Sequence, residues 1–440
     1  MYFRFLLLLI VASFFQSVVA APDDSHFSAG TIDDDLSYIL QHHPKIKASA
    51  EKLSAAQSRS KLTGWYPDPV LGFTFMDAPY KKDPADLSPK AFMGEEWMLS
   101  QSIPTPGRLS VESDITDLEF QIEALRYTIV SNEIASSFVR DLTAAWRIKH
   151  HLDLTRRYLA RFQPMVSISG AQYAMGKGNL TDLSMARLSS RELEERLQQY
   201  DKDHDSSMNQ LTYYLPKEQM HDLESINQFA ERLLTLIKKD DREISKMSAE
   251  LQLAQFNVTI QEKKVALSKL DYMPDFTIFA RYLRSKPGNA EPPPLLADNQ
   301  LSVGLTMRIP LWSAFSNHHG VNEAKSTQNA SQFDYDDLNR AATTAKQSLL
   351  TEIDSATRRL DLYRNRMIPE ANRAVSAARE GYQSGSTEFS SVLRVWDTLY
   401  RLEMDAVELE AERLNKIFEL GRILNLIQPQ QNSLSEAEKK

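Results

Sequence analysis

The sequence contains two copies of one pattern, and this internal duplication constrains the fold more than any other feature. Three landmarks recur in the same order, at spacings of 207, 206 and 209 residues: Tyr66-Pro67-Asp68 with Met273-Pro274-Asp275, Ile103-Pro104 with Ile309-Pro310, and Tyr173-Ala174-Met175-Gly176 with Tyr382-Gln383-Ser384-Gly385. Such nearly constant spacing indicates two repeats of one structural unit. We place the first repeat at residues 33–220, the second at 221–428 and a polar tail at 429–440.

Each repeat has the same order of expected elements. An opening helix is expected at residues 33–64 and again at 240–271, and two short strands follow it. The strands are expected at 70–76 and 96–103 in the first repeat, and at 276–283 and 300–309 in the second. Proline cannot continue a ladder strand or a helix interior, so the proline-rich stretches between the strands are predicted loops. Their prolines are Pro79, Pro84 and Pro89 in the first loop, and Pro287, Pro292, Pro293 and Pro294 in the second.

A long helical pattern follows each Ile-Pro landmark. Apolar residues recur every three or four positions, from residue 115 to 152 in the first repeat and from 349 to 367 in the second. A sustained apolar seam is typical of long helices packed side by side, as in coiled coils. Pro164 and Pro369 interrupt these patterns, and we expect a kink or a local break at each. Each helix ends at a glycine, Gly176 or Gly385, after which an amphipathic stretch returns.

The lengths of these helices predict an architecture. The stretch 108–176 has about 68 residues, which corresponds to roughly 100 Å of helix. The return stretch 180–215 has about 36 residues and the opening helix about 32, so together they match the long helix at the same rise per residue. We therefore expect one long helix antiparallel to two short helices stacked end to end. The strands would lie at one end of this pillar and the glycine turn at the other.

The four strands suggest a membrane barrel shared between chains. Even small barrels need about eight strands, so four cannot close a barrel alone, whereas three chains would supply twelve. Apolar residues alternate with small or polar ones, which suits lipid on one face and water on the other. The apolar set is Leu71, Phe73 and Phe75 in the first repeat, and Val303, Leu305, Met307 and Ile309 in the second. A soluble sheet that caps the helices is the alternative.

The N-terminus has the pattern of a cleaved secretory signal. Arg4 precedes an apolar run at residues 5–15, and small residues follow up to Ala20 and Ala21. We predict a signal peptide at residues 1–20 and a linker at 21–32. An uncleaved anchor is the alternative, although the run is shorter than the roughly 20 apolar residues of a spanning helix.

The composition excludes several kinds of function. The chain has no cysteine, which excludes disulfides, thiolate metal sites and a cysteine nucleophile. The net charge is −8 with scattered basic residues, so nucleic acid is not an expected partner. No catalytic or nucleotide-binding motif occurs, so we expect no catalytic residue, no cofactor and no enzymatic activity.

Three adjacent histidine pairs hold six of the nine histidines: His42-His43, His150-His151 and His318-His319. Neighbouring residues on a helix point about 100° apart, whereas two ligands on one helix face usually lie at i and i+4. We therefore expect no metal site at these pairs.

Nearly the whole sequence after the signal resembles the TolC-like outer-membrane efflux protein family. Tyr66-Pro67-Asp68-Pro69 resembles the family's entrance to its first barrel hairpin, and the stretch 100–108 (SQSIPTPGR) resembles the exit and is the most specific motif. The stretch 305–312 (LTMRIPLW) is similar to the second exit. Met175-Gly176 with residues 180–183, and Tyr382-x-x-Gly385 with Val392-Leu393 and 398–400, resemble the two periplasmic hairpin tips. The first exit leans weakly towards the heavy-metal efflux branch.

The resemblance implies a fold class and a function. The fold would be mostly α with a membrane β portion, in which a homotrimer forms a 12-stranded β-barrel on an α-helical tunnel. The chain would be the outer-membrane channel subunit of a tripartite efflux system in a Gram-negative bacterium, with a long periplasmic portion. It would contact outer-membrane lipid, a periplasmic adaptor protein and an inner-membrane pump of the RND type. A periplasmic adaptor or a soluble helical scaffold is the alternative, and metal, drug and solvent remain open as substrates.

The resemblance also implies two groups of site residues. The hairpin tips would contact the adaptor through Met175, Gly176, Lys177, Ser384, Gly385 and Ser386. A constriction of the tunnel would involve Thr181, Asp182, Tyr382, Ser391 and Arg394. Thr387 stands where the family has a basic residue that links neighbouring hairpins. The family's acidic rings align with Ser391 and Arg394, so an arginine ring would replace an acidic one.

Overall fold

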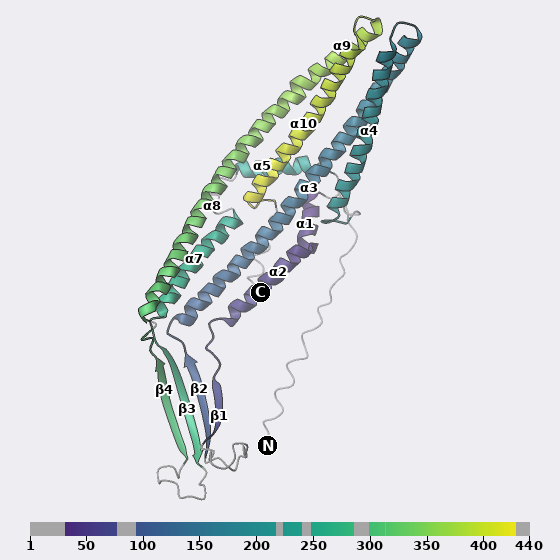
Figure 1. Ribbon diagram of the computed structural model, residues 1–440. Helices are drawn as coiled ribbons and strands as arrows, with labels where there is room; N and C mark the ends of the chain where they lie inside the picture. The colour runs from purple at the N-terminus through teal and green to yellow at the C-terminus, as the bar shows by residue number, and fades with distance from the viewer. Residues whose placement is uncertain are drawn as a thin grey trace.

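The computed structural model describes residues 31–76, 94–216, 223–239, 248–285, 299–312 and 314–427. These form a long pillar with a sheet at one end and two helical hairpin tips at the other (Figure 1). The predicted signal peptide, residues 21–30 of the predicted linker, the proline-rich loops and the polar tail lie outside the described residues. In the described part of the chain, no helix is both long enough and apolar enough to cross a membrane.

The first repeat follows the predicted order, except that its opening helix is two helices. Its elements are α1 (Ile32–His42), α2 (Pro44–Leu62), β1 (Val70–Met76), β2 (Gly94–Ile103), α3 (Arg108–Ala174) and α4 (Leu180–Leu211). The break lies at His43, whose side chain accepts a hydrogen bond from the backbone N–H of Lys45 and so caps α2. Pro44 then occupies the first turn of α2, where its missing N–H costs nothing.

The described part of the second repeat contains one helix that was not predicted. Its elements are α5 (Ser225–Lys239), α7 (Ala249–Leu270), β3 (Asp275–Ser285), β4 (Gln300–Arg308), α8 (Ala314–Leu362), the π-helix η3 (Tyr363–Met367), α9 (Ile368–Ser384) and α10 (Phe389–Ile423). The unpredicted helix is α5, which lies across the long helices near the middle of the pillar (Figure 1). It buries Ile226, Phe229, Ala230, Leu233, Leu234 and Ile237, which recur at helical spacing.

The two interior prolines have different effects. α3 remains one helix of 67 residues through Pro164, so of the two expected alternatives, a kink or a local break, the break does not occur here. Pro369 is the second residue of α9, which follows η3, where five residues adopt the wider π-helical turn. A wider turn accommodates the proline ring, which would otherwise clash with the carbonyl four residues earlier. The expected interruption in the second repeat therefore takes the form of a π-helix.

The pillar confirms the predicted pairing of helix lengths. In the first repeat α3 packs against α4 over its tip-side part, and against α2 over the part nearest the sheet (Figure 1). In the second repeat α8 runs beside α7 near the sheet, and α9 runs beside α10 towards the tip. The two long helices thus carry the strands at one end and the tips at the other.

The two β-hairpins have the same register. The sheet is antiparallel in the order β1-β2-β3-β4. Val70 pairs with Ser100 in the first hairpin, and Thr277 pairs with Thr306 in the second. The sequence spacings of 207 and 206 residues convert the first pair into the second. The duplication therefore extends to the pairing of individual residues.

The sheet has one apolar and one mostly polar face. The first, which we call the apolar face, exposes large side chains in all four strands: Leu71, Phe73, Phe75, Trp97, Leu99, Ile278, Tyr282, Leu301, Val303, Leu305 and Met307. The other, which we call the polar face, carries mainly small or hydrophilic residues, among them Thr74, Glu96, Ser100, Ser102, Thr277, Arg281, Ser302, Gly304, Thr306 and Arg308. The alternation predicted from the sequence is confirmed.

The helical core contains a buried ion network that joins α5 to the long helices of the second repeat. Arg413 on α10 is buried and makes an ion pair with Glu231 on α5. It also lies 3.3 Å from Glu410 and donates a hydrogen bond of 3.0 Å to Thr357 on α8. Glu410 is itself buried and lies 3.4 Å from Arg364 in η3. Arg413 thus connects α5 directly, and η3 through Glu410, to α10.

Replacing Arg413 by leucine should destabilise the helical pillar. Arg413→Leu leaves the Glu410 carboxylate buried with a reduced set of partners, and we expect a loss of about 3 kcal/mol in the free energy of unfolding. The measurement is denaturant-induced loss of helical circular dichroism from the purified protein. Arg358→Leu is the matched control, because Arg358 is exposed and pairs only with Asp354 on its own helix. The control should lose less than about 1 kcal/mol, and equal losses would contradict the prediction.

Candidate functional site

The two hairpin tips lie together at the end of the pillar farthest from the sheet (Figure 1). In each tip a helix ends at a glycine with positive φ, at 68° for Gly176 and 80° for Gly385. This left-handed conformation is costly for residues with a Cβ, which explains glycine at both positions.

Both tips are closed by the same two backbone hydrogen bonds. In the first tip, Gly176 N–H donates to the Tyr173 carbonyl at 3.0 Å and Lys177 N–H donates to the Gln172 carbonyl at 2.9 Å. In the second tip the corresponding bonds join Gly385 to Tyr382 at 3.1 Å, and Ser386 to Gly381 at 2.8 Å. This pair of bonds defines the Schellman motif, which satisfies the last carbonyls of a helix. The spacing of 209 residues relates every donor and acceptor.

One close contact in each tip requires a glycine, but on opposite sides of the contact. In the first tip a Cβ on Gly178 would lie 3.1 Å from the Cβ of Gln172. In the second tip the equivalent positions are Thr387 and Gly381, and a Cβ on Gly381 would overlap the Thr387 hydroxyl. The same close contact between loop and helix therefore occurs in both tips. Its glycine is Gly178 on the loop in the first tip and Gly381 on the helix in the second.

Exchanging these residues provides a test with built-in rescue. Gly381→Gln should loosen the second tip, because the new side chain meets Thr387, and overpacking of this kind costs about 1–3 kcal/mol. Adding Thr387→Gly reproduces the pair found in the first tip and should restore the stability. Hydrogen exchange of the backbone amides of residues 385–387 measures the effect. A double variant that exchanges as fast as the single variant would contradict this account.

The structure brings all six predicted adaptor-contact residues to the tips, where each is exposed. Met175, Gly176 and Lys177 lie at the first turn, and Ser384, Gly385 and Ser386 at the second. The two serine hydroxyls lie 3.0 Å apart, and Ser384 also donates to the Gly381 carbonyl at 3.0 Å. Both tips are therefore accessible, and the second is closed by these side-chain hydrogen bonds. Their contact with an adaptor stays a prediction.

The predicted constriction residues are only partly brought together in one chain. Tyr382 is 7% exposed, and its hydroxyl donates to Ser169 on α3 at 3.4 Å, so it links the second hairpin to the first. Thr181 and Arg394 are exposed, whereas Asp182 and Ser391 are half-buried. The backbone N–H of Asp182 donates to the Asn179 side chain at 2.7 Å, which caps α4. The constriction itself stays a prediction.

The two tips differ in apolar character, a feature that the sequence reasoning missed. Large apolar side chains are exposed near the first tip: Tyr173, Met175, Leu180, Met185 and Leu188. At the equivalent positions of the second repeat, Tyr382 and Phe389 are buried, and Arg394 and Asp397 are charged. Aligning the two repeats residue by residue would have revealed the difference, although only the structure shows which side chains are covered.

An aromatic cluster behind the tips holds the two hairpins together. Tyr158 and Phe162 on α3 contact Trp396 on α10, with ring centroids 5.6 and 5.7 Å apart. Tyr158 also stacks edge-on against Tyr400, whose hydroxyl lies 2.9 Å from that of Thr155. Burial, helped by the Glu403 carboxylate, raises the pKa of the Tyr158 phenol, which therefore stays neutral at physiological pH. These contacts join the two hairpins of one chain behind the tips.

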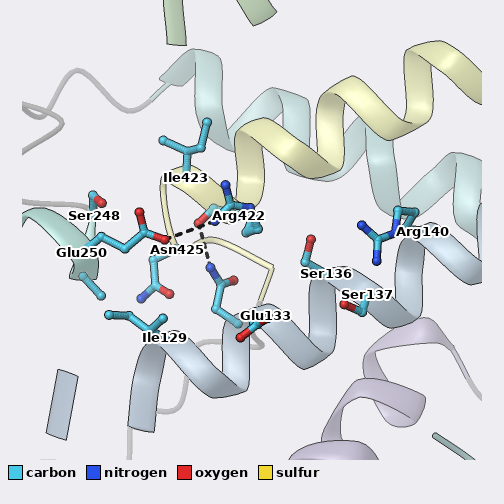
Figure 2. Close-up of a pocket in the computed structure, with 12 residues that line it drawn as sticks. Ile129, Glu133, Ser136, Ser137, Arg140, Ser248, Glu250, Arg422, Ile423 and Asn425 are labelled. Atoms are coloured by element: carbon cyan, nitrogen blue, oxygen red, sulfur yellow. Dashed lines mark hydrogen bonds and ion pairs between the residues drawn. The ribbon is translucent and has the colours of Figure 1, made fainter. Parts of the chain in front are cut away.

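A polar cleft of about 420 Å³ lies at the middle of the pillar, between α3, the start of α7 and the end of α10 (Figure 2). Arg422 pairs with Glu250 at 3.1 Å, and its carbonyl accepts a hydrogen bond of 2.7 Å from the Asn132 side chain. These contacts join the end of α10 to α7 in the same repeat and to α3 in the first repeat. The cleft is open, and the contacts among its lining residues include those of Arg422 with Glu250 and Asn132.

The histidine pairs do not form ligand clusters among the described residues, where no group of three or more His, Cys, Asp or Glu side chains could hold a metal ion. His43 packs against Tyr213, and His151 is buried 3.5 Å from Glu408. Burial holds the pKa of His151 below its ordinary value, and this outweighs the opposing effect of Glu408.

Comparison with known proteins bears directly on this arrangement. Residues 242–426 match the family described as outer membrane efflux protein. This part of the chain is an outer membrane efflux protein domain. It corresponds to the second repeat, and the family resemblance predicted from the sequence is confirmed. No curated protein matches the sequence.

The fold of more than nine-tenths of the chain is similar to that of solved outer-membrane channels. The outer-membrane channel OprN shares 14% identity at a TM-score of 0.74, with 92% of this chain and 94% of that chain covered. CusC shares 15% identity at a TM-score of 0.72, with 91% and 95% covered. The Campylobacter jejuni CmeC outer membrane channel shares 11% identity at 0.71, with 93% and 88% covered. The efflux-protein fold therefore extends over both repeats.

Proposed function

We propose that this chain is the outer-membrane channel subunit of a tripartite efflux system. It passively conducts substrates, delivered by an inner-membrane pump of the RND type and a periplasmic adaptor, to the exterior of a Gram-negative cell. One observation carries the proposal: a sheet with an exposed apolar face lies at one end of the pillar, and two exposed hairpin tips lie at the other. A pillar of this form places its sheet in the membrane and its helices in the periplasm.

The apolar face supports insertion into lipid. Its exposed side chains form one contiguous surface across four strands of 7 to 11 residues. Soluble monomers rarely expose apolar patches of this extent, whereas a tilted strand of about 9–11 residues crosses a bilayer. Exposed aromatic residues lie where the sheet meets the helices: Trp65, Tyr66, Tyr272, Trp312 and Phe315. Aromatic residues are enriched at the boundary between lipid and water.

A homotrimer closes the sheet without changing the structure of the chain. β1 and β4 are the two edges of the four-stranded sheet, and three chains supply twelve strands. The pairing between chains follows from the pairing of β2 with β3, in which Leu99 lies opposite Ala280. The repeat spacing of 206 residues carries Leu99 to Leu305, and the spacing of 207 carries Ala280 to Phe73. Leu305 of one chain therefore pairs with Phe73 of the next.

This register also places apolar side chains opposite one another, although only the repeat spacing was used to obtain it. Leu305 and Phe73 both belong to the apolar face, and Met307 and Val303 fall opposite Leu71 and Phe75. A slip by one residue would place an apolar side chain opposite a polar one, because it moves all side chains of one chain's sheet to the other face of the barrel. The register taken from the duplication keeps one continuous apolar surface around the trimer.

Engineered cysteines test the register directly, because the chain contains no cysteine. Leu305→Cys combined with Phe73→Cys should form disulfides between chains, and the products should extend to a covalent trimer on denaturing gels after oxidation in the membrane. Directly opposed strand residues have Cβ atoms about 4.5–5.5 Å apart, close to the separation in a disulfide. Thr306→Cys with Phe73→Cys is the control, since the two side chains point to opposite faces. Equal cross-linking of both pairs would contradict the register.

The tips supply the contact with the adaptor in this proposal. Both are exposed, and both end on glycines whose backbones allow close approach by another helical hairpin. Thr181, Asp182, Tyr382, Ser391 and Arg394 would narrow the tunnel just behind them. Since Arg394 and Ser391 replace acidic rings, this constriction would not attract cations as an acidic one does.

Cross-linking from the tips tests the adaptor contact. Met175→Cys and Ser384→Cys, each labelled with a photoactivatable maleimide, should capture the co-expressed adaptor in cells. Leu236→Cys is the matched control, because Leu236 is comparably exposed but lies on α5, far from the tips. Capture from the control position but not from the tips would place the adaptor elsewhere. Recovery of the unlabelled protein in the soluble periplasmic fraction would contradict the channel function itself.

A further inference from the structure

Charged side chains are sparse on the polar face of the sheet. In the described strands they are Glu96, Asp275, Arg281 and Arg308. Asp275 lies where the sheet meets the helices, and it accepts hydrogen bonds from the Thr105 N–H at 3.1 Å and the Thr105 hydroxyl at 3.0 Å. Glu96 and Arg281 face each other across β2 and β3, with Oε1 and Nε 3.3 Å apart. They are the only ion pair recorded between the described strands on this face.

The position of Arg281 is restricted by its neighbours on the same face. Its guanidinium carbon lies 6.0 Å from the ring centroid of Phe279, within the range of a cation–π interaction. The Phe279 ring covers Gly304 on β4 so closely that a Cβ there would overlap it. A continuous line of contacts therefore crosses three strands through Glu96, Arg281, Phe279 and Gly304. We call these four residues the inner-face cluster.

The inner-face cluster lies near the loop end of the sheet, away from the helices. Glu96 is the third residue of β2 and pairs with Thr74 on one side and Leu283 on the other. The Glu96 side chain is 14% exposed and the Arg281 side chain 47%, so the arginine projects further from the sheet. The repeat spacings place Ser302 and Thr74 at the equivalent positions of the seam between chains. In the proposed barrel, three ion pairs would alternate with three hydroxyl pairs around the lumen.

We propose that the Glu96–Arg281 pair sets the ion selectivity of the β portion by keeping this level of the lumen electrically balanced. The inference rests on the proposed channel function and names the residues that decide which charged cargo can pass the sheet. With both residues present, neither cationic nor anionic cargo meets an excess charge at this level. Removing one partner exposes a ring of three like charges. One unit charge within several ångströms of an ion's path in water changes its local concentration by about threefold.

The test measures the permeability ratio of K⁺ to Cl⁻ for the purified full-length protein in planar bilayers under a KCl gradient. Glu96→Gln should lower this ratio by about threefold or more, because three arginines then face the lumen unpaired. Arg281→Gln should raise it by a similar factor. The double variant should return to the wild-type ratio. An unchanged ratio in both single variants, or a shift in the same direction, would overturn the inference.

Further variants separate this inference from the function on which it rests. Glu95→Gln removes an adjacent carboxylate on the opposite face of the sheet and should leave the ratio unchanged. If a single variant fails to insert, the exchange Glu96→Arg with Arg281→Glu keeps the pair and should retain the wild-type ratio, whereas a several-fold change would count against the inference. If the wild-type protein forms no channels, the proposed function itself is wrong. If it conducts but the ratio ignores these charges, only the inference is wrong.

Discussion

The four-stranded sheet has two open edges beside an exposed apolar face. In lipid these edges must be paired, and the registers of the hairpins and the arrangement of the helices fit that requirement. Among the described strands β1 and β4 each have one neighbour, so a row of backbone N–H and C=O groups on each has no ladder partner in this sheet. In lipid each unsatisfied backbone group costs several kcal/mol, which is why only closed rings of strands span a bilayer. The identical registers of the two hairpins make closure possible, because the β4 edge already complements the β1 edge of another copy. The pillar follows from this arrangement, since each hairpin continues directly into a long helix.

The two repeats share one backbone plan but differ in the chemistry of their junctions. Where β2 meets β3, Arg108 pairs with Asp271 and Thr105 bonds to Asp275. The repeat spacings carry these four residues to Ala314, Gly64, Leu311 and Asp68, which cannot form the same contacts. The inner-face cluster follows the same rule, because Glu96 and Arg281 correspond to Ser302 and Thr74. The seam inside the chain therefore carries ion pairs, whereas the equivalent positions of the seam proposed between chains do not.

The parts of the fold that follow local rules were predictable from the sequence. Three local signals identified the elements of both repeats: proline and glycine at the strand and tip boundaries, alternation in the strands, and the apolar seam of the long helices. Each of them depends on a few neighbouring residues, and each occurs in both repeats. The tip residues were located correctly for the same reason, since a Schellman turn needs glycine at one position. The errors arise where tertiary packing decides. Pro164 lies in a helix that packing keeps continuous. The exposed apolar residues of the first tip cannot be distinguished from core residues by spacing alone. The helix α5 is a different case, since its apolar spacing is regular and was overlooked.

The unequal tips also limit how a trimer of these chains could open. Tyr382 reaches Ser169 within the chain, and the cluster of Tyr158, Phe162 and Trp396 ties the two hairpins together behind it. Separating the hairpins of one chain would therefore expose buried aromatic surface, at a cost of about 25 cal/mol for each Å². The first tip, by contrast, leaves Leu180 and Leu188 exposed, so this side offers apolar surface for contacts between chains. Six similar hairpins would then open as three rigid pairs, and the contacts that give way would be those between chains.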